Sequence, residues 1–365
     1  MLDEAPSLGI PGISVAIATR HGLTWTGASG VANLQSAQPV TANMLFGIGS
    51  ITKTFVAVVI LQLVEEGRLD LQDTPVDVLN DAVTDIANVR QATIPQLLNH
   101  TGGVPSWEDD PNWIRDGRGA RLDVDHPWGK TDALDYVRGH APLAAPGEKY
   151  SYSNTNYTLL GMMIEKVTGV DAADEIRRRI LHPLGLKDIY LEGFEPVPVH
   201  RLPHRYHRAT PAFRRDAGVN AAFPEVRPEL IDATRSNLSV EWAAGGMLAT
   251  ARDLALYGTA LRDGKLLQSQ SMQLMTRWYP TGKDAIQVGH NVFRWGYPEG
   301  LAHIGHNGDV LGFSAALYWL ESADAVAAAL CNVGTMHSGE IPIGLYSIVK
   351  SREFLERVVR LTNDH

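Results

Sequence analysis

The run Phe313-Ser-Ala-Ala-Leu-Tyr-Trp-Leu320, a short polar turn and the run Ala325-Val-Ala-Ala-Ala-Leu-Cys-Asn332 decide the fold of this chain. Two apolar runs on either side of a turn predict a β-hairpin. A second hairpin is predicted near the other end, where Ile13–Ala18 and Leu23–Thr26 flank Arg20-His21-Gly22. We expect the two hairpins to form one antiparallel sheet.

The middle of the chain has a different pattern, because its apolar residues recur at helical spacing. Helices are expected over Thr52–Glu66, Tyr157–Val167, Asp171–Ile180 and Ala251–Leu261, and over Ile343–Leu361 at the end of the chain. The predicted class is α+β, with an antiparallel sheet flanked by helices (an α/β/α sandwich) and an inserted, mainly helical lobe. Residues 1–58 and 238–365 are assigned to the sandwich and residues 59–237 to the helical lobe, with the active site in the cleft between them.

Composition excludes several classes of protein. The 365 residues carry 32 Lys and Arg against 41 Asp and Glu, a net charge of −9, and 44% of them are hydrophobic. A disordered chain would be poorer in apolar residues, and a general nucleic-acid binder would be basic. Phe55–Val64, the longest helical apolar run, is about half of what a bilayer span requires, so no membrane partner is expected.

The first residues and the single cysteine bear on the cellular compartment. Met1–Pro6 has neither a basic nor an apolar leader segment. The sequence as it stands therefore predicts a cytoplasmic protein, or a periplasmic or secreted one if a leader has been removed. Cys331 cannot form an internal disulfide and lies in an apolar run, so we interpret it as a buried hydrophobic residue.

Ser50 and Lys53 are the first candidates for chemistry. Residues three apart share one face of a helix, so the Lys53 amine can reach the Ser50 hydroxyl and act as its base. Ser50 also opens the long apolar helix, whose positive end suits developing negative charge. The same spacing in Ser347 and Lys350 has no such surroundings and is interpreted as structural.

Two further segments complete the set of candidates. Tyr152-Ser153-Asn154 follows the turn at Pro146-Gly147 and can present a phenol and an amide to a cleft. His306-Asn307-Gly308 precedes the strand that begins at Phe313, where backbone N–H groups at a sheet edge can bind an acyl carbonyl. Taken alone, the first segment is better explained by a tyrosine packed on the helical lobe with Asn154 as a helix cap, and the second by a hairpin turn.

In their order and separation, the three segments resemble the motifs of the serine β-lactamase-like superfamily. This superfamily includes class C β-lactamases, DD-carboxypeptidases, family VIII carboxylesterases and D-amino-acid-specific amidases and peptidases. Further similar segments are Leu97–Pro105, Pro146-Gly147, Pro183–Leu186, Ala244–Met247 and Thr250–Asp253. The resemblance extends from about Ile10 to Val349 and also implies the sandwich with an inserted helical lobe.

The resemblance implies a role for each residue. Ser50 would be the acylated nucleophile, and Lys53 and Tyr152 would share proton transfer. Asn154 would bind the carbonyl or amide of a small-molecule ester, amide or peptide substrate, and His306, Asn307 and Gly308 would line the site. The backbone N–H groups of Ser50 and Asp309 would form the oxyanion hole, and neither a cofactor nor a metal would be needed.

One departure from the family pattern narrows the activity. Asn307 stands where the carboxypeptidases and lactamases usually carry threonine, and a histidine rather than a lysine precedes it. This weakens the case for a β-lactamase or a D-Ala-D-Ala carboxypeptidase and leaves an esterase, an amidase or peptidase, or acyl transfer.

Alternatives remain at this stage. An acyltransferase or cyclising thioesterase would pass the acyl group to an acceptor other than water. The segment Ser106–Lys130, with Trp107, Trp113 and Trp128, could then act as a shielding lid or simply fill small cores. A sensor that is acylated without turnover is the third possibility.

His200, His204 and His207 have a spacing that could suit a metal, but no cysteine or carboxylate cluster accompanies them. The oligomeric state cannot be read from the sequence.

Overall fold

The computed structural model describes residues 2–296, 302–321, 323–339, 344–349 and 351–363. Its main feature is an antiparallel sheet with the strand order β10-β11-β12-β13-β14-β15-β1-β2-β3. The strands are β1 (Gly12–Thr19), β2 (Gly22–Asn33), β3 (Gln38–Pro39), β10 (Tyr279–Pro280), β11 (Ile286–Val288), β12 (Phe293–Gly296), β13 (Ala302–Val310), β14 (Phe313–Leu320) and β15 (Val326–Cys331). The two predicted hairpins are β1–β2 and β14–β15, and they join where β1 pairs with β15, with Val15 opposite Ala329.

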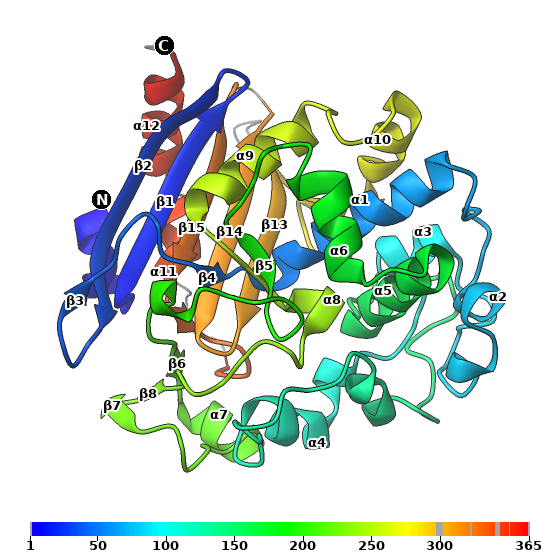
Figure 1. Cartoon of the computed structure of the whole chain (residues 1–365), viewed down its shortest axis with the longest axis horizontal. Coiled ribbons are helices and arrows are strands. Elements are labelled where there is room, and N and C mark those ends of the chain that lie inside the picture. The colour runs from blue at the N-terminus through cyan, green and yellow to red at the C-terminus, as the bar shows by residue number, and fades with distance from the viewer. Residues whose placement is uncertain (1, 297–301, 322, 340–343, 350, 364–365) are drawn as a thin grey trace.

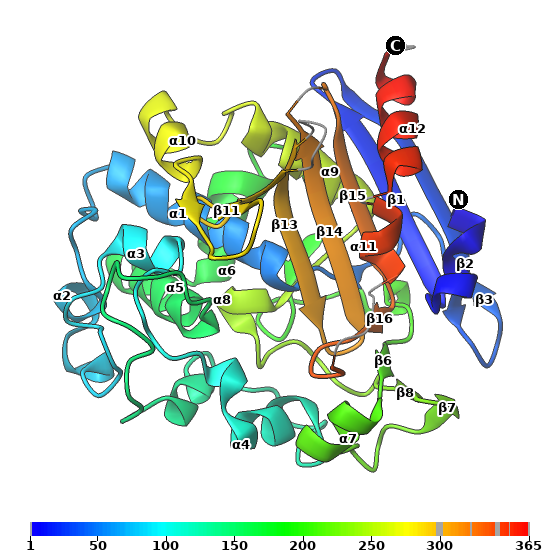
Figure 2. The same ribbon diagram turned by 180° about the vertical axis from the view of Figure 1, so that it is seen from behind.

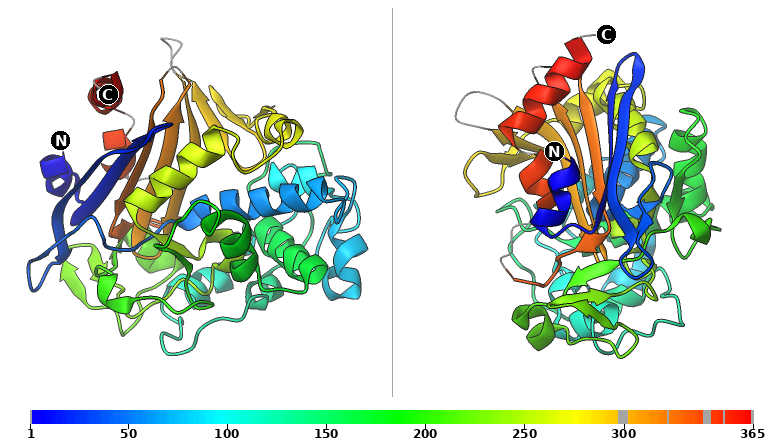
Figure 3. Two further views of the ribbon diagram at one scale, coloured as in Figure 1. Left: turned by 45° about the horizontal axis from the view of Figure 1, so that its top comes forward. Right: turned by 90° about the vertical axis from the view of Figure 1, so that its left-hand side faces the viewer.

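Helices cover both faces of this sheet. On one face lies α9 (Ala251–Arg262), and on the other lie the 3₁₀ helix η1 (Leu2–Leu8), α11 (Gly344–Val349) and α12 (Arg352–Asn363). Figures 1 and 2 show these two faces from opposite sides, and Figure 3 shows that both ends of the chain lie on the same face of the sheet. The predicted α+β sandwich is therefore confirmed.

The region between the terminal hairpins is mainly helical. Its helices are α1 (Thr52–Glu65), α2 (Pro75–Leu79), η3 (Asn80–Val83), α3 (Ile94–Leu98), η4 (Trp107–Asp109), α4 (Pro111–Trp113), η5 (Ile114–Arg118), η6 (Asp132–Tyr136), α5 (Asn154–Thr168), α6 (Ala172–Ile176), η7 (Arg177–Leu181), η8 (Val199–Arg201), α7 (Pro211–Asp216), α8 (Trp242–Gly245) and α10 (Ser269–Met275). The 3₁₀ turn η2 (Gly49–Ile51) leads directly into α1.

Two small sheets join this region to the large one. The first has the order β4-β9-β5 and the second β16-β6-β8-β7. Their strands are β4 (Phe46–Gly47), β5 (Ile189–Leu191), β6 (Tyr206–Arg208), β7 (Glu225–Arg227), β8 (Leu230–Asp232), β9 (Met247–Ala249) and β16 (Val333–Gly334). Because β4 pairs with β9, the residues just before Ser50 are fixed against a strand that lies far away in the sequence.

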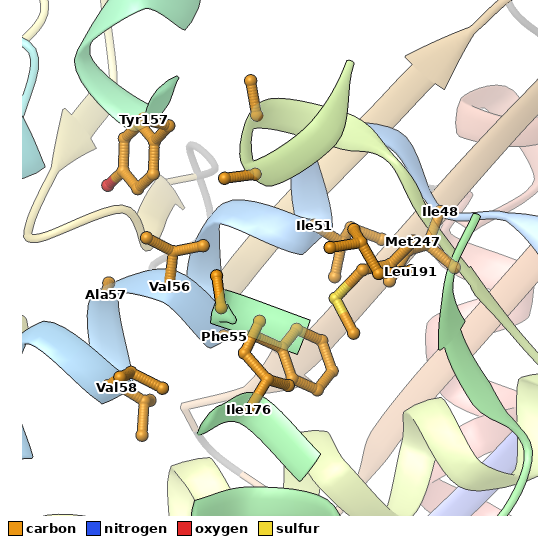
Figure 4. Close-up of a cluster of buried hydrophobic side chains, with 14 of the residues drawn as sticks. Ile48, Ile51, Phe55, Val56, Ala57, Val58, Tyr157, Ile176, Leu191 and Met247 are labelled. Atoms are coloured by element: carbon orange, nitrogen blue, oxygen red, sulfur yellow. The ribbon is translucent and has the colours of Figure 1, made fainter. Parts of the chain in front are cut away.

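Helix α1 is buried on almost every side, which explains its uniformly apolar sequence. Phe55, Val56, Ala57 and Val58 have no exposed surface. Figure 4 shows these side chains pointing in different directions around the helix, with Tyr157 of α5 nearby. The same burial removes water from Lys53, in the first turn of the helix.

The predicted C-terminal helix differs from the structure, since two helices replace it. The Ser351 hydroxyl accepts a hydrogen bond from the Phe354 N–H at 3.1 Å, which is the N-terminal capping arrangement of a new helix. Of the second Ser-x-x-Lys spacing, Lys350 and the side chain of Ser347 lie outside the described residues. Within the described part of the chain, no helix is long and apolar enough to cross a membrane.

Candidate active site

Ser50 lies at the start of the buried helix, held by a glycine on its N-terminal side. Gly49 has φ +50, a left-handed conformation that glycine adopts without strain. A Cβ on Gly49 would lie 2.7 Å from the backbone N of Asp309, so η2 and β13 approach each other closely here. Ser50 is therefore brought directly beside the third motif of the sequence.

Lys53 faces Ser50 from the next turn of the helix, as predicted. Its Nζ donates to the Ser50 Oγ at 2.8 Å and to the Ala244 carbonyl oxygen at 2.6 Å. Burial lowers the pKa of Lys53 strongly, and Glu108 and Glu241 partly oppose this shift. A neutral amine is thus accessible next to the serine hydroxyl.

Tyr152 completes a three-membered contact around the serine. Its hydroxyl donates to the Ser50 Oγ at 2.8 Å, and the Lys53 Nζ lies 5.0 Å from the centre of its ring. Burial raises the pKa of Tyr152 well above its usual value, so the phenol keeps its proton in the free protein. The structure therefore brings Ser50, Lys53 and Tyr152 together.

Asn154 lies beside this group at the start of α5, where a buried ion network holds its amide. The Asn154 Nδ2 donates to the Glu108 carboxylate, which also accepts from the Arg118 Nη2 at 2.9 Å. Arg118 donates in addition to Glu241 at 2.7 Å, and its side chain is 1% exposed. Burial is the main cause that raises the pKa of Glu241, and the Arg118 charge opposes it.

Glu108, Arg118 and Glu241 are site residues that the sequence analysis missed. Glu108 and Arg118 belong to the segment Ser106–Lys130, in which the tryptophans are the most conspicuous residues. The usable signal was the presence of an arginine and a glutamate in a segment rich in buried aromatic residues, because charges in such surroundings must be paired.

The third motif lies on β13, at a point where that strand loses one neighbour. β12 pairs with β13 only from Ala302 to Gly305. The residues that follow on β13 pair with the strand β14 alone, and their other edge faces η2. Gly308 is required there, because a Cβ on it would lie 1.9 Å from the Ile48 carbonyl oxygen. The backbones of residues 49 and 309 can lie side by side only because Gly308 has no side chain.

His306 and Asp309 differ from what their residue types suggest. Burial lowers the pKa of His306 to about 3, so it is a neutral ring, and its Nδ1 contacts the backbone oxygen of Asn307. Burial raises the pKa of Asp309 to about 6, while its carboxylate accepts from the Thr335 hydroxyl at 2.6 Å. The Tyr346 hydroxyl donates to the Gly308 carbonyl oxygen at 2.9 Å, so β13 is supported from behind.

Two of the three tryptophans of residues 106–130 fill the interior, and the third is partly buried. Trp107 and Trp113 are fully buried, with ring centres 4.5 Å apart, and the Trp107 Nε1 donates to the Thr158 hydroxyl at 3.1 Å. Trp128 stacks on Tyr136 at 5.9 Å. Of the two interpretations, the structure favours packing over a lid.

The three histidines do not converge on one point. His200 is exposed, His204 contacts Asp232 at 2.7 Å, and His207 contacts the Met336 carbonyl oxygen at 2.9 Å. Among the residues that the structure describes, no three potential ligand side chains group closely enough to hold a metal ion.

Comparison with known proteins shows the family to which the chain belongs. The family model described as Beta-lactamase matches residues 3–342, nearly the whole chain. The chain belongs to the Beta-lactamase family.

Two relatives show how similar the sequence of this chain is to those of known proteins. Esterase EstB of Burkholderia gladioli is 30% identical over 58% of this chain and 55% of its own length. Penicillin-binding protein 4 of Amycolatopsis lactamdurans is 29% identical over 90% of this chain and 82% of its own length. This chain therefore spans only about half of the length of the esterase.

Among solved structures, D-amino acid amidase from Ochrobactrum anthropi SV3 superimposes with a TM-score of 0.82 and 26% identity, covering 100% of this chain and 97% of its own. The fold of the whole chain is therefore similar to that of this amidase.

Proposed function

We propose that this protein is a serine hydrolase that cleaves an ester or an amide through a covalent acyl-enzyme. The observation that carries the proposal is the contact of the Ser50 Oγ with both the Lys53 Nζ and the Tyr152 hydroxyl at 2.8 Å. A serine hydroxyl becomes a good nucleophile when a base beside it accepts its proton. Lys53, buried and shifted towards its neutral form, is that base.

Each step of the reaction has a group to perform it. The neutral Lys53 amine takes the proton as the Ser50 Oγ forms a bond to the substrate carbonyl carbon. The negative charge moves to the carbonyl oxygen, which the N–H groups of Ser50 and Asp309 stabilise. When the bond to the leaving group breaks, Tyr152 donates a proton to the departing oxygen or nitrogen and recovers one from Lys53. Water then attacks the acyl carbon as the neutral Lys53 amine takes a proton from it. The bond to the Ser50 Oγ breaks, the serine oxygen regains its proton through Tyr152, and the acid is released.

Asn154, His306, Asn307 and Gly308 form the substrate-binding part of this proposal. Glu108 holds the Asn154 amide in place, and His306 contributes no charge because it stays neutral. Without a lysine or a threonine in the third motif, the site has fewer donors for a substrate carboxylate. The names of the relatives, an esterase and a D-amino acid amidase, support an uncharged ester or amide as the group attacked.

A tryptophan lid over the bound acyl group would have supported acyl transfer to an acceptor other than water. Trp107 and Trp113, two of the three tryptophans that could shield an acyl-enzyme, are packed in the protein interior, and the half-buried Trp128 stacks on Tyr136. We therefore propose water as the acceptor.

The test replaces the nucleophile. Ser50→Ala should abolish the hydrolysis of p-nitrophenyl acetate while the far-ultraviolet circular dichroism spectrum and the melting temperature stay near those of the wild type. Intact-protein mass spectrometry with esters, D-amino-acid amides and β-lactams should show acyl adducts on the wild type and none on Ser50→Ala. Normal turnover by Ser50→Ala would overturn the proposal, and a single burst without turnover by the wild type would favour the sensor.

A further inference from the structure

His100 is a buried histidine that the proposed reaction does not use, although its ring lies against Tyr152. The two ring centres are 4.2 Å apart, with 27° between the planes, which is a stacked arrangement. His100 follows α3 and is fully buried. It also has φ +59, a left-handed conformation that is uncommon outside glycine, although asparagine, aspartate and histidine adopt it more often than other residues.

His100 accepts hydrogen bonds from the residues on both sides of Tyr152. The His100 carbonyl oxygen accepts from the Ser151 N–H at 2.8 Å, and the His100 Nδ1 accepts from the Ser153 N–H at 3.1 Å. One residue therefore binds the backbone N–H groups of the residues immediately before and after the tyrosine and also packs on its ring. The left-handed backbone at residue 100 is what allows these contacts to be made together.

The hydrogen bonds also define the protonation of the ring. Because Nδ1 accepts from a backbone N–H, the proton of the neutral ring lies on Nε2, which faces the Asn291 Oδ1 at 3.4 Å. Burial, followed by the charge of Lys53, holds the pKa of His100 well below its usual value. The ring therefore adds no positive charge beside Lys53 and cannot itself serve as the proton carrier.

We propose that His100 is a positioning residue that fixes the Tyr152 hydroxyl against the Ser50 Oγ. The inference rests on the proposed function, because it assumes that Tyr152 transfers protons. The positioning effect itself does not depend on the reaction, because three contacts from His100 restrict the backbone and the ring of Tyr152. Misplacing a catalytic group by about 1 Å can reduce a rate about 100-fold.

His100→Asn is the appropriate variant. Asparagine accepts a left-handed backbone, so the substitution removes the ring without adding strain. With p-nitrophenyl acetate as the probe, kcat should fall by about 10- to 100-fold while KM changes by less than about 3-fold.

The decisive measurement is a double-mutant cycle with Tyr152→Phe. If His100 acts through the phenol, His100→Asn should reduce kcat by less than about 2-fold when the phenol is already absent. An equal fall in both backgrounds, or an unchanged kcat in the wild-type background, would overturn the proposal. If Tyr152→Phe keeps the wild-type kcat, then the proposed role of Tyr152 fails instead.

His207 provides a matched control. It is also fully buried, its Nδ1 accepts from the Gly312 N–H at 3.3 Å and its Nε2 faces the Met336 carbonyl oxygen, but its ring packs against Phe213 instead of Tyr152. His207→Asn should lower the melting temperature, and any fall in kcat should persist in the Tyr152→Phe background. If His100→Asn fails to fold, Asn291→Gly removes only the Nε2 partner at a residue with φ +62. It should lower kcat by about 2- to 10-fold, and only when the phenol is present.

Discussion

Gly308→Ala is the substitution for which the structure gives the clearest expected magnitude. The new Cβ would lie 1.9 Å from the Ile48 carbonyl oxygen and 3.2 Å from the Cα of Gly49. Contacts of a Cβ below 3.0 Å are essentially never observed, so β13 and the segment before Ser50 must separate by at least about 1.1 Å. Both neighbours are backbone atoms, and no side-chain rotation can relieve the clash.

This separation acts directly on the proposed oxyanion hole. The hole needs the N–H groups of Ser50 and Asp309 at hydrogen-bond distance from one oxygen, and Gly308 precedes Asp309. A shift of about 1 Å leaves at most one of the two donors in contact. Losing one such donor reduces kcat by about 10²- to 10³-fold, or about 3–4 kcal/mol of transition-state stabilisation.

The assay is steady-state hydrolysis of p-nitrophenyl acetate, with the melting temperature measured in parallel. Gly296→Ala is the matched control, because a Cβ there would have its nearest neighbour at 3.7 Å, the carbonyl oxygen of Ala285 just before β11. The control should keep kcat within about 3-fold of the wild type. A folded Gly308→Ala protein with a similarly unchanged kcat would refute the link between this close approach and catalysis.

Two further predictions concern charge. Burial lowers the pKa of Lys53 to about 7, and only the unprotonated amine can accept a proton, so kcat/KM should fall about tenfold per pH unit below that value. A profile that stays flat from about pH 7 to pH 5 would contradict this assignment. Glu108→Gln and Glu241→Gln each remove one carboxylate from Arg118, but only Glu108 binds Asn154. Only Glu108→Gln should therefore raise KM, by about 3- to 10-fold for an amide substrate, and equal effects of the two variants would refute the role of Glu108.

The sequence predicted the large elements well, because each has a regular apolar pattern. The strand Phe313–Leu320 has the predicted bounds, and α1 ends one residue before the predicted end. The predicted helix Asp171–Ile180 instead changes after Ile176 to a wider π-helical turn, Arg177–Leu181. The side chains of Arg178 and Arg179 both pair with Glu175 there, an interaction that apolar periodicity does not report.

The candidate site was predictable where its residues belong to motifs, and not where they act through tertiary contacts. Ser50 and Lys53 are one helical turn apart, so their contact follows from local geometry alone. His100 and Arg118 are different, because each acts on residues about 50 to 120 positions away. No local pattern specifies that His100 has a left-handed backbone or that Arg118 lies between two carboxylates.

Burial of Lys53 gives the fold and the proposed chemistry a common physical basis. The apolar helix α1 removes water from the amine, which favours its neutral form. Glu108 and Glu241 act in the opposite direction, since two nearby carboxylates stabilise the ammonium. Arg118 binds both carboxylates and also disfavours the ammonium, so its charge reduces their effect on Lys53. Glu108 can therefore hold the Asn154 amide beside the nucleophile while the amine keeps access to the uncharged form that a general base requires.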